Sequence, residues 1–290
     1  MLDFWIAVDG GGTGTRVLLT RAHGAVIGHG HAGPSALGQG IEAAWIHIVQ
    51  AVQQAFAEAG LPYAPAQVAM GAGLSGVNNL AWREAFIAAN PGFGSLLLAS
   101  DATTMLLGAH GGRPGAMVAA GTGSVGEALH PDGSRTTVGG WGFPVGDEGS
   151  GAWLGLQAMR LAQAALDGRA TATALTHAVL QQCGNQRSDL QAWCAQAGQG
   201  GYASLAPMVF ASQQQDTAAN ALVCAAANEL ERIALALDPA QRLPVAFCGS
   251  IGQLLKTHVS VPLQARLVEP QSGATDGALE LLKKKIGNMP

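Results

Sequence analysis

Charged side chains are scarce in this sequence. Asp, Glu, Lys and Arg make up 12% of the 290 residues, whereas a typical soluble domain has about 25%. The net charge is −4, and the one run of basic residues is Lys283-Lys284-Lys285. Three lysines at the end of a helix suit its dipole better than they suit a nucleic-acid surface. We therefore expect no nucleic-acid partner.

Cysteine is also rare, and its spacing excludes several kinds of site. The four cysteines, Cys183, Cys194, Cys224 and Cys248, form no C-x-x-C pair. This pattern is typical neither of a disulfide framework nor of a zinc or iron–sulfur site. We expect buried thiols in a reducing compartment.

Long apolar runs and the lysine of a P-loop are absent as well. No apolar stretch reaches the ~18 residues of a membrane span. The strand-like residues 4–8 begin too early to leave room for a signal peptide. These features predict a cytoplasmic protein without membrane contact. The lack of G-x-x-x-x-G-K excludes a P-loop nucleotide site.

Glycine, in contrast, is abundant. It supplies 41 of the 290 residues, about twice the usual share. Because 48% of the residues are apolar, the chain has ample material for a core, and its glycine favours phosphate loops and tight turns over disorder.

The apolar pattern predicts one order of elements twice: strand, glycine turn, strand, hairpin turn, strand, helix, strand, helix, strand, helix. In the first half, we expect strands at 4–8, 16–20, 25–31, 67–70 and 95–99, with helices at 41–55, 79–89 and after 101. In the second half, we expect strands at 116–120, 125–129, 136–138, 244–248 and 265–268, with helices at 152–166, 217–237, after 252 and from 275. The sequence thus predicts a duplicated α/β fold.

A glycine-rich hinge near residues 111–115 divides the two halves. We place the first domain at residues 1–112 and the second at residues 113–290. The second half also carries an extra segment without a counterpart in the first. This helical insertion covers about residues 168–216.

Two segments match G-x-G-x-x-G, the dinucleotide-binding pattern, which must open a helix. The match at 121–126 runs instead into a strand and the hairpin turn at 131–133. The match at 71–76 precedes a helix and has Asp101 about 25 residues later, so a dehydrogenase stays an alternative. That interpretation leaves the other glycine loops unexplained.

A phosphate-binding role explains two of the loops together. Asp9-Gly-Gly-Gly-Thr-Gly-Thr15 and Ala120-Gly-Thr-Gly-Ser124 stand at equivalent points of the two halves. Consecutive glycine amides bind anions, and a threonine hydroxyl adds a donor. Each loop by itself could be a tight hairpin without a ligand. Their equivalence favours one polyphosphate bound by both.

These loops and several other segments resemble the actin-like, hexokinase-type ATPase superfamily. Within it, the chain is similar to N-acetylglucosamine and glucosamine kinases, in the branch related to activator ATPases. The matches are specific in their combined order and span nearly the whole chain. They are Asp9-Gly-Gly-Gly-Thr13, Leu74-Ser-Gly76, Ser100-Asp-Ala102, Ala120-Gly-Thr-Gly-Ser124, Gly139-Gly-Trp-Gly142, Gly146-Asp-Glu-Gly-Ser150, Cys248-Gly-Ser-Ile251 and Asp276-Gly-Ala278.

The resemblance implies two duplicated actin-like ATPase (ribonuclease H-like) domains with a cleft between two lobes. It implies transfer of the γ-phosphoryl group of ATP to the 6-hydroxyl of an amino sugar, foremost N-acetylglucosamine, by a homodimer. The residues expected to bind ATP are Gly11, Gly12, Thr13, Gly121, Thr122, Gly123 and Gly249. Asp9 is expected to hold Mg²⁺ through water, which suits an ion that keeps several water ligands.

Asp101 is expected to be the catalytic base, because the resemblance and its place after an apolar strand agree. The alternative is that Asp101 is merely the N-cap of the following helix. The expected sugar contacts are Ser75, Gly76, Asp101, Gly140, Trp141 and Asp147. Core packing is the alternative for Trp141, and helix capping is the alternative for Asp147-Glu148.

The chain departs from the family at two places. Many relatives have a sugar-facing Asn after the third strand, but residues 33–39 contain none, so Ser35 or Gln39 could replace it. A Gly-Asp pair before the adenosine-side helix reads Gln215-Asp216 here. Two related activities therefore stay open: a glucosamine kinase, and an ATPase that activates radical acyl-CoA dehydratases or reductases. The activators bind an iron–sulfur cluster at a dimer interface, for which Cys194 and Cys248 look unsuited.

Overall fold

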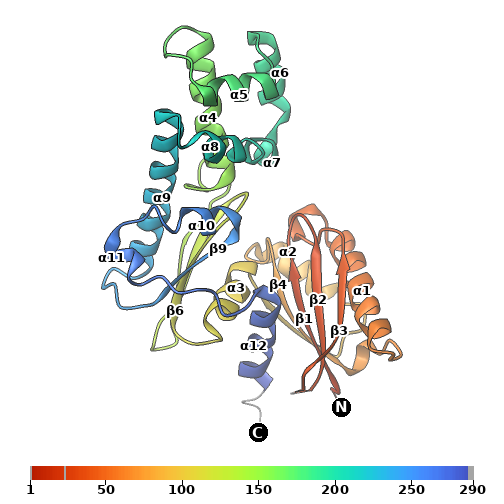
Figure 1. The fold of residues 1–290 in the computed structure, drawn as a ribbon. Coiled ribbons are helices and arrows are strands. Elements are labelled where there is room, and N and C mark those ends of the chain that lie inside the picture. Colours follow the sequence, from red (N-terminus) through yellow and green to blue (C-terminus); the bar gives the residue numbers. More distant parts are fainter. Residues whose placement is uncertain (1, 23, 287–290) are drawn as a thin grey trace. The chain divides into compact units, whose positions relative to one another are not determined.

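The computed structural model describes residues 2–22 and 24–286 (Figure 1). The outermost limits of the two expected domains, residues 1 and 290, lie outside this range. The chain forms two compact units. Unit 1 contains the residues up to Pro114 and those from Pro270 onward, and unit 2 is Gly115–Glu269. The division near residue 112 thus has a counterpart in the structure, but the segment after Pro270 belongs to unit 1.

Unit 1 contains a five-stranded sheet in the order β3-β2-β1-β4-β5. Strand β1 pairs antiparallel with β2 and parallel with β4, and β4 is parallel to β5. The strands are β1 (Phe4–Gly10), β2 (Thr15–Arg21), β3 (Val26–Ala32), β4 (Val68–Leu74) and β5 (Ser95–Ala99). The helices are α1 (Ile41–Glu58), α2 (Leu80–Ala88), α3 (Asp101–His110) and α12 (Ala274–Ile286), with 3₁₀ turns η1 (Leu37–Gln39) and η2 (Pro65–Gln67).

Both faces of this sheet are covered. Ile6, Val8, Val68 and Met70 pack with α1 on one face, where Ala44, Ile48 and Val52 supply the helical apolar stripe. On the other face, α12 contacts β1, β4 and α3, and its buried Ala278, Leu279 and Leu282 cluster with Trp5, Ala7 and Ala69. The periodicity of α12 predicts a helix, but it does not tell which sheet the helix covers.

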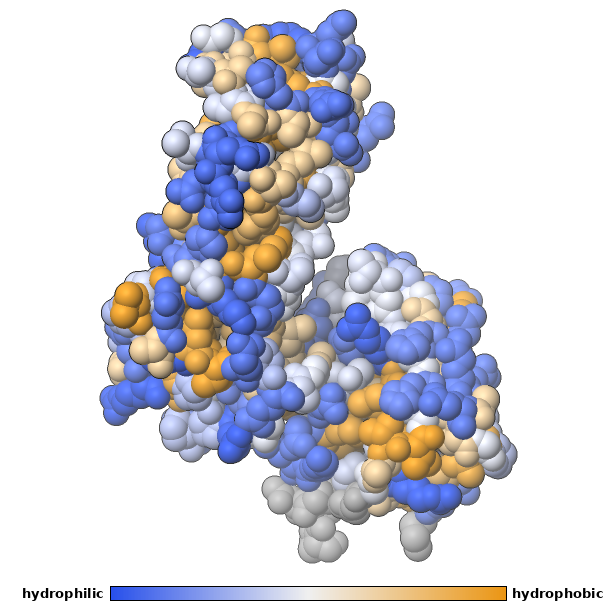
Figure 2. Space-filling view, viewed as in Figure 1, coloured by the Kyte–Doolittle hydropathy of each residue, from blue (hydrophilic) through white to orange (hydrophobic). Residues whose placement is uncertain are grey.

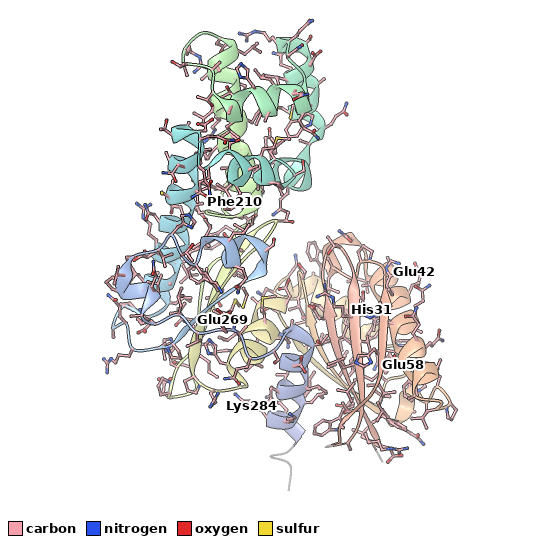
Figure 3. All side chains as sticks on the ribbon, viewed as in Figure 1. His31, Glu42, Glu58, Phe210, Glu269 and Lys284 are labelled. Atoms are coloured by element: carbon pink, nitrogen blue, oxygen red, sulfur yellow. The ribbon has the colours of Figure 1, made fainter. Side chains whose placement is uncertain are left out.

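Helix α1 also protects the edge strand β3. The backbone amides of His29 and His31 donate to the side chains of Glu58 and Gln54, at 2.7 and 3.0 Å; Figure 3 labels His31 and Glu58 on these two elements. The helix approaches closely because Gly28 lies in β3 beneath it. A Cβ there would lie 2.1 Å from the carbonyl oxygen of Ala55. Side chains that occupy edge amides keep a sheet from pairing with another chain.

Unit 2 repeats this arrangement with a four-stranded sheet in the order β8-β7-β6-β9. Strand β6 is antiparallel to β7 and parallel to β9, as β1 is to β2 and β4. The strands are β6 (Gly115–Ala120), β7 (Ser124–Leu129), β8 (Arg135–Gly139) and β9 (Val245–Cys248). The predicted duplicated α/β fold is therefore confirmed.

The strand expected at 265–268 is wrong. Leu267 makes an isolated parallel bridge with Val245, outside the named strands. The amide of Val245 donates to Arg266, and that of Val268 donates to Val245. Pro270 follows two residues later and has no amide hydrogen for a longer ladder. The bridge holds the place that β5 takes in unit 1.

The helices of unit 2 enclose a separate core. Helices α4 (Gly151–Leu166) and α9 (Thr217–Leu237) supply the largest share of it, including Leu154, Ala158, Val223 and Leu230. The range 168–216 contains α5 (Ala174–Cys183), α6 (Arg187–Gln196), α7 (Gly198–Ala203) and α8 (Ala206–Ser212). Two short helices, α10 (Gly249–Leu255) and α11 (Val261–Gln264), follow β9.

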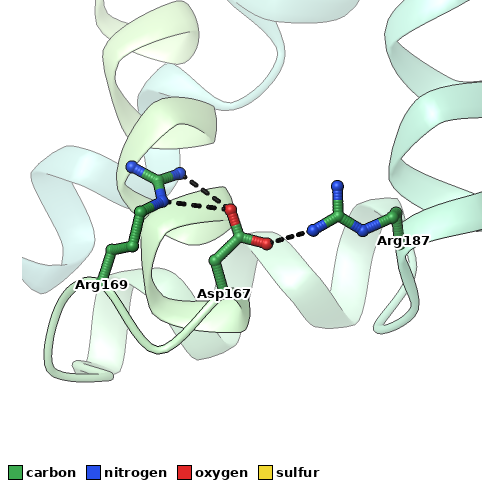
Figure 4. A network of polar contacts seen from close by, with 3 residues as sticks. All are labelled: Asp167, Arg169 and Arg187. Atoms are coloured by element: carbon green, nitrogen blue, oxygen red, sulfur yellow. Dashed lines mark hydrogen bonds and ion pairs between the residues drawn. The ribbon is translucent and has the colours of Figure 1, made fainter.

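One carboxylate links the end of α4 to the start of α6. Asp167 accepts hydrogen bonds from both Arg169 and Arg187 (Figure 4), with distances of 2.9 and 2.6 Å to their terminal nitrogens. Both arginines are largely exposed, so each pair contributes at most about 1 kcal/mol. These pairs therefore contribute little to stability.

The surface is mixed in character. In the view of Figure 2, hydrophobic residues form separate groups among hydrophilic ones on both units. Within residues 2–22 and 24–286, none of the helices has the length and apolar character needed to cross a bilayer.

Candidate active site

Three predicted site residues lie at one edge of the unit 1 sheet. Asp9 is near the end of β1, Ser75 follows β4, and Asp101 follows β5. Asp9 is paired with Gly73, and Gly73 with Ala99, so the carboxyl ends of these parallel strands are aligned. Ligands of open α/β sheets bind outside such strand ends.

Asp9 is a half-buried carboxylate with charges on both sides. Burial raises its pKa, the guanidinium of Arg16 opposes this, and the carboxylate of Asp101 adds to it. Arg16 lies 3.6 Å from Asp9 on the neighbouring strand. Two nearby carboxylates that resist ionisation offer a favourable place for a cation. Asp9 therefore fits a magnesium ion that is also held by water and phosphate oxygens.

Asp101 is the first residue of α3 and does not cap it. The N-cap is Ser100, whose side chain accepts from the amide of Thr103 at 3.0 Å. The capping alternative for Asp101 is therefore wrong. Burial raises the pKa of Asp101, while the amide of Ala102 and the side chain of Ser75 lower it in part. A carboxyl with a raised pKa at the strand ends is compatible with the predicted role of a general base.

The first glycine loop is anchored through Gly11. Its amide donates to Gly14, and its carbonyl accepts from the amides of Ser35 and Ala36. A Cβ at Gly11 would meet nothing within 4 Å, and Gly12 and Thr13 are exposed. The loop thus presents backbone and a threonine hydroxyl to its surroundings, as an anion-binding turn requires.

The two candidates for the missing asparagine have different environments. Ser35 is fully buried and accepts a hydrogen bond from the hydroxyl of Thr15 at 2.7 Å. Gln39 is exposed, and its amide donates to the carbonyl of Gly12 at 3.3 Å. Of the two, Gln39 is the side chain that a ligand beside this loop can reach.

Gly76 forms the turn after β4 with a φ of 87°, which favours glycine. A Cβ at this position would lie 3.2 Å from the ring of Trp82. The backbone of the Leu74-Ser-Gly76 segment is also fixed, because Leu37 donates to the carbonyl of Ser75. Ser75, Gly76 and Asp101 all belong to unit 1.

The second glycine loop, which lies in unit 2, is also anchored through its backbone. The amide of Gly121 donates to Gly123, and the carbonyls of Gly121 and Thr122 accept from the first amides of α4, at Gly151 and Ala152. Among the described residues, none accepts from the amides of Thr122 and Gly123. These two amides are the donors that a phosphate could use.

Asp147 lies directly behind this loop. Asp147 is 4% exposed. Its carboxylate accepts hydrogen bonds from the amide of Ser124 at 3.1 Å and from the side chain of Gln199 at 2.7 Å. Burial raises its pKa, and these donors oppose the rise. The N-cap of α4 is Ser150, so the capping alternative for Asp147-Glu148 is wrong.

Trp141 lies on the surface of unit 2. It is 84% exposed, which excludes the core-packing alternative. Its neighbours Gly140 and Gly142 both have left-handed φ values, 70° and 83°, so the loop turns sharply on either side of the indole. The ring is available to a ligand.

Gly249 brings the turn after β9 against the second glycine loop. Its φ is 78°, and a Cβ there would lie 2.4 Å from the carbonyl oxygen of Ala120. A cavity of about 420 Å³ opens beside this turn. It is bordered by the loop, the start of α4, the helical insertion and α10, through Gly121, Thr122, Gly151, Ala203, Ala206, Pro207, Phe210, Ser250, Ile251 and Leu254.

The cavity includes residues that sequence reasoning missed. Ala203, Ala206, Pro207 and Phe210 come from α7 and α8 of the helical insertion; Figure 3 labels Phe210. The available signal was the one aromatic residue, Phe210, in the mostly apolar segment 206–212. Asp216, in contrast, is a structural residue: it caps α9 through the amides of Ala218 and Ala219.

The cysteines are free thiols. Cys183 and Cys248 are buried, and Cys224 is exposed. Burial raises the pKa of Cys183 and of Cys248 to about 11, which disfavours the thiolate that binds metals. Among the described residues, no three His, Cys, Asp or Glu side chains are grouped so as to hold a metal ion.

Comparisons with known proteins identify a family and several relatives. The family model described as the BadF/BadG/BcrA/BcrD ATPase family matches residues 6–251. The glucosamine kinase GspK of Vibrio cholerae is 32% identical over 99% of this chain and 98% of its own length. A solved structure from Chromobacterium violaceum, provisionally assigned as an N-acetylglucosamine kinase, is 48% identical with a TM-score of 0.93, over 97% of this chain and 99% of that one. A Porphyromonas gingivalis structure with the same provisional assignment has a TM-score of 0.69 at 21% identity, over 96% and 98% of the two chains, which shows the fold alone.

Proposed function

We propose, since this chain belongs to the BadF/BadG/BcrA/BcrD ATPase family, that it is a sugar kinase that phosphorylates an amino sugar with ATP. The relatives at 32% and 48% identity are named for glucosamine and N-acetylglucosamine. We further propose that N-acetylglucosamine is the preferred acceptor and that its 6-hydroxyl is the nucleophile. Glucosamine is the alternative acceptor.

One observation carries the proposal: Asp101 stands at the edge of the strand ends with a carboxylate that no capping role occupies. Asp101 would orient the sugar hydroxyl and accept its proton as the phosphoryl group transfers. Phosphoryl transfer depends mostly on positioning and on stabilising charge. Ser75 and Gly76 in unit 1, and Gly140, Trp141 and Asp147 in unit 2, stay predicted sugar contacts.

The glycine loops would bind the phosphates. Gly11, Gly12 and Thr13 would contribute from unit 1, and Gly121, Thr122 and Gly123 from unit 2. Support comes from the free amides of Thr122 and Gly123 and from the open space at Gly11 and Gly121. Asp9 would hold Mg²⁺ through water, and the ion would neutralise charge on the transferring phosphates.

The cavity beside Gly249 would take the adenosine. Its lining is mostly apolar, and Phe210 offers an aromatic edge or face to a base. Its position next to Gly121 and Thr122 would continue a nucleotide from the phosphate loop into the cavity.

The experiment is a coupled measurement of ADP release with Mg-ATP over four sugars: N-acetylglucosamine, glucosamine, N-acetylmannosamine and glucose. Strong turnover on one amino sugar, with a 6-phosphate product by NMR, supports the proposal. ATP hydrolysis that no sugar stimulates contradicts it and favours the activator ATPases, for which a stoichiometric iron–sulfur cluster in purified protein is the independent sign.

Two further properties rest on the family resemblance. We propose a homodimer, which light scattering after size-exclusion chromatography measures, and a cytoplasmic location, which fractionation of the producing cell measures.

A further inference from the structure

Asp147 joins three segments of unit 2 through one buried carboxylate. It accepts hydrogen bonds from the amide of Ser124 beside the phosphate loop and from the side chain of Gln199 in α7, and it belongs to the loop that carries Trp141 and Phe143, whose amide helps to lower its pKa. Gln199 makes the shortest of the measured bonds, with 2.7 Å from Nε2 to Oδ2. Gln199 therefore connects the helical insertion to the residue behind the phosphate loop.

The carboxylate of Asp147 also lies directly behind Gly123. A Cβ at Gly123 would lie 2.9–3.0 Å from all three atoms of the carboxylate group. Asp147 itself has a left-handed φ of 63°, a backbone conformation that is costly for a residue other than glycine. Because loop and carboxylate are in contact, a rotation of the carboxylate would move Gly123 or release the anchored amide of Ser124.

Helix α7 depends on such contacts for its position. Its six residues, Gly198–Ala203, include three glycines, and glycine is a poor helix former. Tyr202 packs on Phe143 with 5.2 Å between ring centroids. Its backbone lies so close to α4 that a Cβ at Gly155 would be 1.8 Å from the carbonyl oxygen of Tyr202. Helix α7 is thus held against α4 and against the loop that carries Phe143.

We propose that Gln199 is a positioning residue for ATP binding, which acts through Asp147 on the phosphate loop Gly121–Gly123. The inference rests on the proposed function. Gln199 donates a hydrogen bond to Oδ2 of Asp147. Oδ1 of Asp147 can then keep its bond with the amide of Ser124, and the carboxylate stays in place behind Gly123. The helical insertion then contributes to phosphate binding without contacting the phosphates.

The charges around Asp147 give the proposal a specific pH signature. Glu148 is the neighbouring carboxylate that disfavours ionisation of Asp147, and Gln199 is one of the donors that favour it. Gln199→Ala removes this donor, so the pKa of Asp147 rises. As the pH is lowered, this variant should therefore lose ATP affinity at a higher pH than the wild type does. Gln199→Glu keeps the size of the side chain but donates only while the new carboxyl is protonated. Its ATP affinity therefore falls as pH rises, which is the opposite trend.

The test compares Gln199→Ala and Gln199→Glu with Gln196→Ala, an exposed glutamine at the end of α6. Equilibrium binding of a non-hydrolysable ATP analogue with Mg²⁺ is measured from pH 5 to 9, together with KM for ATP and kcat. We expect about tenfold weaker nucleotide binding for Gln199→Ala at neutral pH, a larger change in KM than in kcat, and the inverted pH trend for Gln199→Glu. Gln196→Ala should match the wild type.

Nucleotide affinity of Gln199→Ala within twofold of the wild type, or a Gln199→Glu variant without the inverted trend, would overturn the inference. Both variants change an exposed side chain. Thermal unfolding reports whether either variant loses the fold; in that case, the pH trend expected for the other variant decides. The binding measurement needs no sugar. If the wild type phosphorylates no amino sugar, the proposed function is wrong. The nucleotide affinities of the Gln199 variants still decide the present inference, because they are measured without sugar.

Discussion

The hydroxyl of Ser100 caps helix α3 by accepting a hydrogen bond from the amide of Thr103 at 3.0 Å. A helix needs only one residue in this role at its first turn. The carboxylate of Asp101, one residue later, is thereby left to face the strand ends where Asp9 and Ser75 lie. Because Ser100 and not Asp101 caps the helix, the proposed catalytic role of Asp101 can be tested without loss of the cap.

Asp101→Asn should lower kcat by about 10²–10⁴-fold, the usual contribution of a general base. Nucleotide affinity and the melting temperature should change little, since Ser100 retains the cap. Asp3→Asn, an exposed carboxylate of the same unit, is the matched control. Sugar-dependent turnover within tenfold of the wild type would remove Asp101 from the mechanism.

The pH profile should report the ionisation of Asp101. Burial raises the pKa of this carboxyl, and a base must be ionised to accept a proton. Activity should therefore be lost as pH falls through a value above the ordinary pKa of an aspartic acid. Ser75→Ala removes the side chain that helps to lower the pKa of Asp101, so its acid limb should move to higher pH. An unshifted limb in a folded Ser75→Ala variant would disconnect Ser75 from Asp101.

Alanine substitutions at two glycines should detect bound phosphate. A Cβ at Gly11 or Gly121 would meet nothing within 4 Å of protein, so Gly11→Ala and Gly121→Ala should keep the melting temperature. Each should weaken ATP binding by tenfold or more, about 1.4 kcal/mol, because the methyl group enters the space that a phosphate would occupy. Gly273→Ala, also in open space, is the control. Unchanged ATP affinity in both variants would count against phosphate at these loops.

Asp216 should contribute to stability in a pH-dependent way. It caps α9 through Ala218 and Ala219 and accepts from the amide of Leu175 in α5 at 2.8 Å. Burial opposes its ionisation, but these donors and Thr173 outweigh burial and lower the pKa. A lowered folded-state pKa gives stability that is present above the unfolded-state pKa and lost as pH falls through the folded value.

Asp216→Ala should therefore destabilise the protein by about 1–3 kcal/mol near neutral pH, and the difference should shrink at acid pH. Asp216→Asn should lose less, since its oxygen can still cap α9 while its amino group faces the amide of Leu175. Chemical denaturation at pH 7 and at pH 3 measures both differences. Equal stability of the wild type and Asp216→Ala at pH 7 would contradict the capping role.

Phe210→Ala should raise KM for ATP about tenfold with a smaller effect on kcat, if the base packs on the ring in the cavity beside Gly249. Phe210→Leu should recover part of the loss by keeping apolar area. The affinity for inorganic triphosphate, which has no base, should be the same in all three proteins. A parallel loss of triphosphate binding would show that the cavity does not serve the adenosine.

Sequence patterns predicted the local structure well because each pattern depends on neighbours along the chain. The strand at 4–8, the helix at 217–237 and the turns at Gly11 and Gly121 follow from apolar periodicity and glycine spacing. Distant packing was not predictable in this way. The apolar stripe of α12 is compatible with either sheet, and Asp147 gives no sign in sequence that Gln199, 52 residues away, bonds to it.

The candidate site also has features that the sequence could predict and features that it could not. The resemblance supplied Asp9, Asp101 and the glycine loops because their chemistry lies in short segments. The capping alternatives for Asp101 and Asp147 could not be decided, since Ser100 and Ser150 are equally good caps in sequence and only geometry selects them. Phe210 lies in an inserted segment whose helices contact the loop through tertiary packing, which periodicity does not encode.

The return of α12 to unit 1 has a consequence for biosynthesis. Trp5, Ala7 and Ala69 bury one face of the first sheet against Ala278, Leu279 and Leu282, and Lys284 donates to the carbonyl of Gly112 at the end of α3. Because a ribosome synthesises the N-terminus first, one apolar face of this sheet stays uncovered until all of unit 2 and then α12 have been made. Early termination anywhere after unit 2 would yield a polypeptide whose second unit can fold but whose first cannot be completed, a natural substrate for chaperones and proteases.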